Sequence, residues 1–239
     1  MQTFSIFVES QPELASGIEQ AIESGGLRAQ PIHLRTGDYL FRVGDRVSCT
    51  YYIYRGLVRL SSTNASGDSK TVFLHRAGSL IGFQTMQDID VPNPESILDA
   101  QATSTCEVYA IDGALFRDFL VAHGDLCFAM ARYLFGMLVN QTRESVNGSM
   151  YPVLDRFAAL LLMLARELRL TLAPAVVPFT NAELAAMLGV HPNSITNAIT
   201  SLRRVECVER QHGCLVITDF RKLKRIAGDL IGDEHAGRR

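Results

Sequence analysis

Short apolar runs follow one another between residues 30 and 112, and glycines separate them. The runs at 32–34, 39–41, 51–54, 57–60 and 71–74 have the length and composition of strands, and a second set lies around 96–110. Gly37, Gly44, Gly56, Gly67 and Gly78 fall between them. Many short strands at regular spacing predict a sandwich or a barrel-like roll.

A long helix is predicted from Asp125 towards Val146, after a short helix over 113–122 that Asp112 can cap. One side of the long helix carries apolar residues at four–three–four spacing, and a second side is also apolar. The first set is Leu126, Met130, Tyr133 and Met137, and the second is Phe128, Leu134, Phe135, Leu138 and Val139. A helix that is apolar on two sides must bury both. We expect one side to cover the roll and the other to meet a second copy of the helix; the alternative is a single helix enclosed in its own domain.

The segment Asn147-Gly148-Ser149 is the predicted hinge after the long helix. A further helix is expected over 153–170, because its apolar residues recur at helical spacing. Those expected to face inward are Leu154, Phe157, Leu161, Leu164 and Leu168. A second domain therefore begins near residue 150.

Residues 179–204 predict a short helix, a tight turn and a second helix. Thr180 and Glu183 have the spacing of a capping box, Gly189 suits the turn, and His191 precedes Pro192 at the start of the second helix. The second helix can bury Ile195, Ala198, Ile199 and Leu202 while leaving Asn193, Ser194, Thr196, Asn197, Thr200 and Ser201 as an uncharged polar face. Arg203 and Arg204 end it.

These are the parts of a DNA-reading helix–turn–helix: a bracing helix, a helix with hydrogen-bonding side chains, and cations near phosphates. The alternative is an ordinary pair of packed helices. The turn spacing and the polar second helix favour DNA binding. Two short runs at 207–210 and 214–217 flank His212-Gly213 and predict a hairpin, or wing, from which Arg210 and His212 would reach phosphate.

Asp219 can cap a last helix with Phe220, Leu223, Ile226, Ala227 and Leu230 on its apolar side. The cations of this helix, Arg221, Lys222, Lys224 and Arg225, are expected to form a solvated face. The net charge of the chain is −2, but residues 1–149 hold 11 Lys+Arg against 16 Asp+Glu, and residues 150–239 hold 12 against 9. The positive excess lies in the half that carries the predicted DNA reader, as phosphate attraction requires.

Composition excludes several other classes. The sequence has no membrane-length apolar run and no secretion-signal pattern at its start, and its five cysteines form no paired framework. We therefore expect a cytoplasmic protein with reduced thiols and no membrane partner.

No catalytic or metal-binding constellation is visible, so we expect no enzyme, no metal and no cofactor. Buried structural thiols are the simplest role for Cys106 and Cys127, and a redox switch between Cys207 and Cys214 is the less favoured alternative. Haem would need an axial ligand such as His33, His75, His123 or Cys49, and lone histidines are more often hydrogen-bonded than ligating.

The order of parts resembles the cyclic-AMP receptor/fumarate-nitrate regulator (CRP/FNR) family of bacterial transcription factors. The residues that carry the resemblance are Gly44, Gly56, Gly67, Gly78 and Gly82, the phrase 51–56, Cys106-Glu107-Val108, and Leu188-Gly189-Val190. Within the family, Ser79-Leu80-Ile81-Gly82 and Gly189-Val190-His191 are most similar to the branch that senses halogenated phenols.

The resemblance implies an α+β fold with three parts: a jelly-roll-like β-roll sensor at 1–124, a dimerisation helix and hinge at 125–149, and a winged helix–turn–helix at 150–239. It also implies a homodimer through 125–146, a palindromic operator, RNA polymerase as a partner and a small-molecule effector. The alternative function is a sensor module that acts through protein contacts and no longer reads DNA.

The departures from the family bear on the effector. Phe83 stands where the cyclic-nucleotide branch has a ribose-binding glutamate, and the region of Glu95 and Ser96 lacks the arginine that binds the cyclic phosphate. No Lys or Arg occurs between Arg76 and Arg117, so an effector other than cyclic AMP is expected.

The predicted effector site is Phe83, Gln84, Arg132 and Tyr133. An arginine beside aromatic residues suits a small aromatic or apolar acid. The alternative is that Arg132 is exposed to solvent or pairs with an acid such as Asp125 or Glu144.

In the family, bases are read from positions that are Pro192, Asn193 and Asn197 here. Proline offers no side-chain donor, whereas asparagine matches the N6/N7 edge of adenine. The full set of residues predicted to contact DNA is Thr180, His191, Asn193, Ser194, Asn197, Ser201, Arg203, Arg204 and Arg210.

Overall fold

The computed structural model describes residues 6–8, 10–64, 67, 69–86, 94–170 and 172–231. It divides into two compact units. The N-terminal unit contains residues 6–62 and 71–139, and the C-terminal unit contains residues 63–70 and 140–239. The boundary at 139/140 falls within the long helix rather than at 124/125 or 149/150, so this helix contributes residues to both units.

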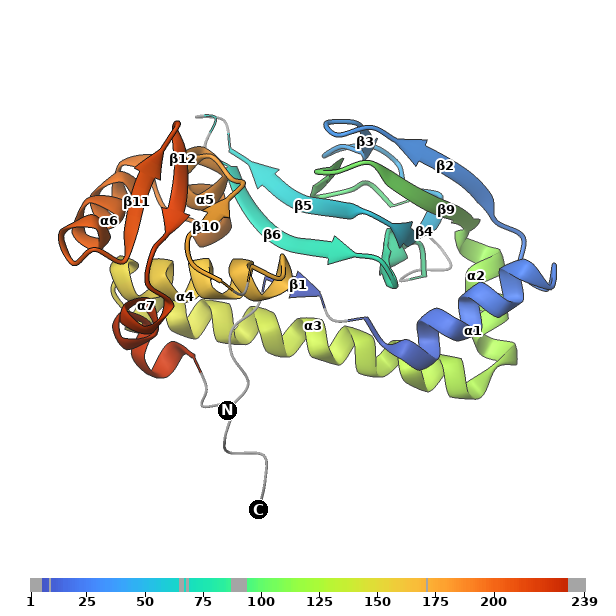
Figure 1. The fold of residues 1–239 in the computed structure, drawn as a ribbon. Coiled ribbons are helices and arrows are strands. Elements are labelled where there is room, and N and C mark those ends of the chain that lie inside the picture. The colour runs from blue at the N-terminus through green and yellow to red at the C-terminus, as the bar shows by residue number, and fades with distance from the viewer. Residues whose placement is uncertain are drawn as a thin grey trace, which may run out of the picture. The chain divides into compact units, whose positions relative to one another are not determined.

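The N-terminal unit is built on two sheets (Figure 1). One has the strand order β1-β6-β5-β8-β3 and the other β2-β9-β4-β7. The bounds are β1 Phe7–Val8, β2 Gln30–Leu34, β3 Tyr39–Phe41, β4 Cys49–Arg55, β5 Leu57–Thr63, β6 Ser69–Arg76, β7 Ser79–Ile81, β8 Asp99–Ala102 and β9 Cys106–Asp112. The inward side chains of both sheets form one apolar core that includes Tyr52, Val58, Leu80 and Val108. The predicted roll is confirmed; β1 and β7 were not predicted.

The described part of this unit also contains a 3-10 helix, η1 (Phe83–Met86), and three α-helices: α1 (Pro12–Glu23), α2 (Gly113–Ala122) and the first part of α3 (Gly124–Met150). Asp112 caps α2 as predicted, accepting hydrogen bonds from the N–H groups of Ala114 and Leu115. The helix α1 was not predicted. It packs closely on α3, because a Cβ atom at Gly17 would lie 2.5 Å from the Leu126 side chain.

The two apolar sides of α3 have different environments. Met130, Tyr133 and Met137 are buried in the roll core. Phe128, Phe135 and Leu138 are 68%, 66% and 62% exposed. We call these three residues the exposed stripe of α3; their spacing of seven and three residues places them on one face. The side with four–three–four spacing therefore covers the roll, and the second side has no covering element among the described residues.

The predicted hinge at Asn147-Gly148-Ser149 is wrong, because α3 continues through it to Met150. The helix stops before Pro152, which is the N-cap residue of α4 (Val153–Glu167). Proline lacks an N–H and disfavours a helical conformation in the residue before it, so it ends the helix more strongly than one glycine does.

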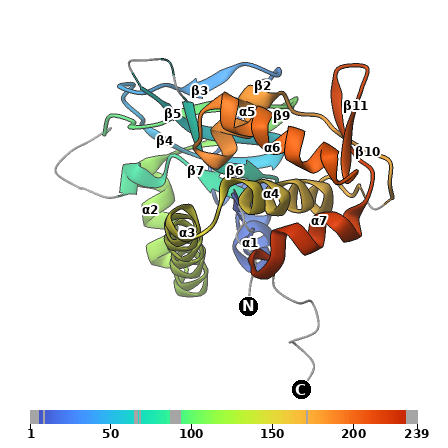
Figure 2. The same cartoon turned by 90° about the vertical axis from the view of Figure 1, so that its left-hand side faces the viewer.

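The C-terminal unit places the helices α4, α5 (Asn181–Leu188), α6 (Pro192–Arg204) and α7 (Phe220–Ala227) beside a small sheet (Figure 2). The sheet order is β10-β12-β11, with bounds Ala175–Val177, Cys214–Ile217 and Val208–Gln211. The core includes Phe157, Leu161, Leu184, Leu202 and Leu223, all fully buried. The predicted helix 153–170 ends at Glu167, with Leu168 as its C-cap, and α7 is followed by a short 3-10 turn over Gly228–Leu230.

The roll buries a histidine side chain. His75 on β6 is fully buried. Its Nδ1 lies 3.2 Å from the hydroxyl of Tyr133, which donates to the carbonyl of Leu80 at 2.8 Å. Burial lowers the pKa of His75 from 6.5 to about 3. The imidazole is therefore neutral in the folded protein at physiological pH.

We expect His75 to make the roll sensitive to acid. The unfolded chain binds a proton near pH 6.5, but the folded chain does not until about pH 3. The contribution of His75 to the free energy of unfolding is fully present above pH 6.5. Between pH 6.5 and about pH 3, the free energy of unfolding falls by about 1.4 kcal/mol for each unit that the pH drops. Urea unfolding at several pH values measures how steeply the free energy of unfolding depends on pH. His75→Gln should flatten this dependence, whereas His33→Gln, at an exposed residue, should leave it unchanged. An NMR titration that shows His75 charged at pH 5.5 in the folded protein would contradict the prediction.

Candidate nucleic-acid interface and effector cavity

Local sequence signals fix the start of α5. The hydroxyl of Thr180 accepts a hydrogen bond from the Glu183 N–H at 3.2 Å, and the Glu183 carboxylate accepts from the Thr180 N–H at 2.8 Å. This is the predicted capping box. The Thr180 hydroxyl also donates to the same carboxylate at 2.8 Å. Its hydrogen-bonding capacity is therefore largely used inside the cap, which leaves little for DNA.

The turn between the two helices is built as predicted. Gly189 has a left-handed backbone, with φ 62° and ψ 42°, at the end of α5. The ring of His191 accepts a hydrogen bond from the Asn193 N–H at 3.2 Å, which makes it the N-cap of α6. Pro192 occupies the first helical position. The exposed imidazole of His191 thus marks the beginning of α6.

The outer face of α6 offers side-chain amides for recognition. Asn193 and Asn197 are exposed and lie one turn apart on the same face. Within the described residues, neither side-chain amide has a hydrogen-bond partner, so both can pair with the edge of a base. The hydroxyls of Thr196, Thr200 and Ser201 instead donate to carbonyls of the helix itself. Ser194 is half-buried.

The predicted cations differ in how free they are. Arg203 and Arg204 are exposed in the last turn of α6 and have no ion-pair partner in the described part of the chain. Arg210, by contrast, donates to the Gly213 carbonyl at 2.7 Å and to the Asn181 side chain at 2.5 Å. Arg210 therefore ties the β11–β12 hairpin to the start of α5. The hairpin itself is as predicted, with His212 and Gly213 at φ 50° and 83°.

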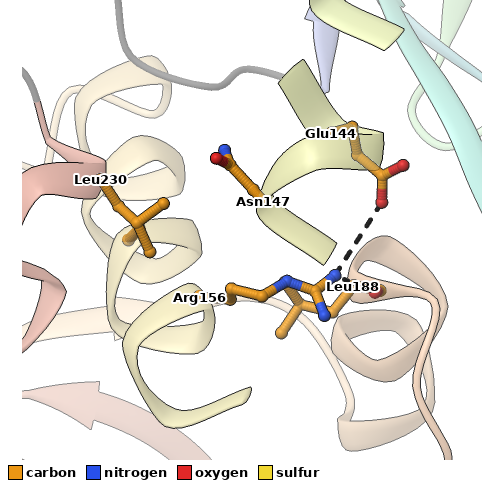
Figure 3. Close-up of a pocket in the computed structure, with 6 residues that line it drawn as sticks. Glu144, Asn147, Arg156, Leu188 and Leu230 are labelled. Atoms are coloured by element: carbon orange, nitrogen blue, oxygen red, sulfur yellow. Dashed lines mark hydrogen bonds and ion pairs between the residues drawn. The ribbon is translucent and has the colours of Figure 1, made fainter. Parts of the chain in front are cut away.

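A nearly buried ion pair holds the end of the first helix of the helix–turn–helix. Arg156 of α4 donates to the carbonyl of Leu188, the last residue of α5, at 2.8 Å. The same nitrogen lies 3.9 Å from a carboxylate oxygen of Glu144 (Figure 3). The two side chains are only 12% and 14% exposed. Lys70, in the same unit, pairs with the other oxygen of Glu144 at 3.2 Å. Sequence reasoning missed this pair, since its members have no local pattern.

The roll contains a cavity of about 240 Å³. Its walls are apolar, and Phe41, Leu60, Phe73, Phe83, Leu98 and Met137 contribute to them. Gln84, Glu95 and Ser96 are its polar residues, and the Ser96 hydroxyl already bonds to the backbone of Leu98. Gly82 also lines it, with φ +76°, and a Cβ there would lie 2.6 Å from the Cys49 carbonyl oxygen. Only glycine fits this approach without strain.

The structure does not bring the four predicted effector residues together. Phe83 and Gln84 line the cavity, whereas Arg132 and Tyr133 do not. Arg132 lies on the surface and pairs with Glu13 of α1 at 3.0 Å. Tyr133 is buried, and its hydroxyl is satisfied by Leu80 and His75. The prediction that Arg132 stands beside Phe83 to hold an acid is therefore not supported by the geometry.

The described residues form neither a metal site nor a pair of facing thiols. Among the described residues, no group of three or more His, Cys, Asp or Glu side chains could hold a metal ion. Cys207 is buried and donates to the Leu202 carbonyl, and burial raises the pKa of its thiol. Cys214 is exposed and pairs in register with Gln211 rather than Cys207, so the hairpin does not bring the two thiols face to face. Within the described residues, no helix is both long and apolar enough to cross a bilayer.

Two known domain families match separate parts of the chain. The cyclic nucleotide-binding domain family matches residues 31–123. The Crp-like helix-turn-helix domain family matches residues 155–226. The two matches fall on the roll and on the helix–turn–helix with its hairpin.

Curated relatives and solved structures agree with these matches. The cAMP-activated global transcriptional regulator CRP of Haemophilus influenzae is 22% identical over 180 residues, covering 74% of this chain and 79% of that protein. The fumarate and nitrate reduction regulatory protein of Vibrio cholerae is 24% identical over 221 residues, covering 88% and 81%. The structure of the c-di-GMP responsive global regulator CLP of Xanthomonas campestris, 16% identical, matches with a TM-score of 0.74 over 86% of this chain and 99% of that one. This last likeness shows the fold alone.

Proposed function

The chain belongs to the CRP/FNR family of transcription regulators, and from that premise we propose that it is a homodimer that reads a palindromic operator under the control of a small effector other than cyclic AMP. The known relatives are regulators rather than enzymes. The proposal also includes cytoplasmic localisation and contact with RNA polymerase, which follow from this mode of action.

The observation that carries the DNA-reading part is the outer face of α6. In the described part of the chain, the side-chain amides of Asn193 and Asn197 lie one turn apart without hydrogen-bond partners, and Arg203 and Arg204 at the end of the same helix have no ion-pair partner. Asparagine amides pair in bidentate fashion with adenine in the major groove, and arginines at the helix end suit phosphates. The proposed reading residues are Asn193 and Asn197, with His191, Ser194 and Ser201 at their edge.

The exposed stripe of α3 supports the homodimer. Phe128, Phe135 and Leu138 are large apolar side chains in water on a helix whose other side is already buried. A second copy of α3 packed along this stripe would bury all three. Two copies related by a two-fold axis would present two α6 helices to paired half-sites, which is what a palindromic operator needs.

The cavity in the roll is the proposed effector site, with Phe83 and Gln84 in its wall. A ligand that binds one arrangement of the dimer more tightly than another shifts the population towards it. The two recognition helices then take one spacing, and the affinity for the operator changes.

Selection of DNA from a random pool by the full chain, followed by gel shifts in a salt series, tests the function. We expect a palindromic site with adenine at read positions. Asn197→Ala should cost about 1–3 kcal/mol of binding free energy and relax specificity at one base pair. The matched control is Gln211→Ala in the hairpin, which should leave base preference unchanged.

Two outcomes would count against this function. Equal weakening of Asn197→Ala on every sequence would mean that Asn197 contacts only the backbone. Failure to select any DNA, with ligand binding intact, would favour the alternative of a sensor module that acts through protein contacts.

A further inference from the structure

We infer that the cavity in the roll takes an uncharged, largely apolar small molecule and rejects anions. This inference rests on the proposed function, because it names the chemical class of the proposed effector. It departs from a cyclic nucleotide and from the aromatic acid that the sequence suggested. The cavity volume of about 240 Å³ suits a compound of one or two rings.

The cavity offers no positive charge to an anion from its described lining. Among the described residues that line the cavity, none is a Lys or Arg, and the one charged group is the carboxylate of Glu95. The sequence has no Lys or Arg between Arg76 and Arg117. Arg59 is adjacent to the cavity residue Leu60 on β5, but successive strand residues face opposite ways, and Arg59 donates to Gln101 at 2.5 Å. An anion in this cavity would lose its hydration without gaining a counter-charge.

The lining of the cavity favours an apolar ligand with few polar groups. The cavity wall offers aromatic, aliphatic and thioether surface, which favours apolar contact; it comes from Phe41, Leu60, Phe73, Phe83 and Met137. The Ser96 hydroxyl is occupied by the Leu98 backbone. The side chain of Gln84 has no hydrogen-bond partner in the described part of the chain, so it can serve one polar group of the ligand. Glu95 is exposed, and solvent screens it, so a positive charge on the ligand gains little there.

Two fluorescent two-ring probes with one skeleton test the inference on the full chain: 1-aminonaphthalene, which is uncharged, and 1-aminonaphthalene-5-sulfonate. We expect the uncharged probe to bind at least about tenfold more tightly, since only the sulfonate must be desolvated without a partner. Leu98→Trp, which fills the cavity, should lower the affinity for the uncharged probe by at least about fivefold. Val121→Ala, at an exposed residue of α2, should have no effect.

A charge variant makes the test specific to the cavity. Ile97 lines the cavity and is 81% exposed, so Ile97→Arg should fold normally. It should raise the affinity for the sulfonate by at least about fivefold, whereas Ile97→Gln should not. The inference is overturned if the unaltered chain binds the sulfonate as tightly as the uncharged probe, or more tightly. It is also overturned if neither Leu98→Trp nor Ile97→Arg changes the affinity for the probes. Gel shifts on the same preparations keep the two questions apart, because a chain that shifts its operator yet fails these tests remains a regulator with a different ligand class.

Discussion

Leu138→Glu should convert the protein to a monomer and lower its affinity for a palindromic operator by about a hundredfold or more. Leu138 lies in the exposed stripe of α3, so a pair of helices packed along this stripe would bring two carboxylates together in an apolar interface. Reading two half-sites at once multiplies affinity, and a monomer loses this gain. The fold of each chain should survive, because Leu138 is 62% exposed and supports no core.

Sedimentation and gel shifts on the same samples measure both effects. Val121→Glu is the matched control, because it places the same charge on an exposed apolar residue of α2 outside the stripe. It should leave the protein dimeric and the affinity for DNA unchanged. A Leu138→Glu protein that stays dimeric would show that the two copies meet elsewhere.

The helix–turn–helix could be predicted almost to the residue because its signals are local. The capping box at Thr180 and Glu183, the left-handed Gly189 and the N-terminal Pro192 each act within a few residues of the position they define. Such short-range chemistry is fully visible in a sequence. The alternating strands of the roll are visible for the same reason, because each carries its own period and its own turn.

Other elements could not be predicted because their cause is distant. β10 (Ala175–Val177) is a strand only because it pairs with β12. Gly17 weakens the helical pattern of α1, and the glycine is required because the Leu126 side chain, on α3, packs against it. In both cases the tertiary contact outweighs the local preference.

The same limit explains the effector site. Arg132 was expected near Phe83 because both were assigned to the region where the helix passes the roll. Its actual partner, Glu13, is 119 residues away in the sequence and lies on the helix that was not predicted. Arg210, which is expected at phosphate, also bonds to Asn181, 29 residues away, and the sequence does not indicate this partner. A long flexible cation takes whichever partner the fold brings to it, and the sequence does not show which one.

Arg156→Met should loosen the helix–turn–helix and weaken DNA binding while leaving the roll intact. Arg156 is nearly buried, and it joins the carbonyl at the end of α5 to the carboxylate of Glu144 (Figure 3). Methionine fills the space but leaves the Leu188 carbonyl without its donor and Glu144 with Lys70 alone. Breaking such a pair from one side costs about 2 kcal/mol or more, because a desolvated charge remains.

Hydrogen exchange followed by mass spectrometry locates the effect. Peptides that cover α5 and the turn should exchange at least about tenfold faster in Arg156→Met, and peptides from the roll should not change. Arg166→Ala is the matched control, because its ion pair with the adjacent Glu167 is formed by an arginine that is 57% exposed. The double variant Glu144→Gln with Arg156→Met should recover part of the protection, since it removes the nearly buried carboxylate that the single variant leaves with Lys70 as its one ion-pair partner among the described residues. Unchanged exchange in Arg156→Met would mean that helix packing alone holds the turn. In that case, the affinity for DNA should also stay at its original value.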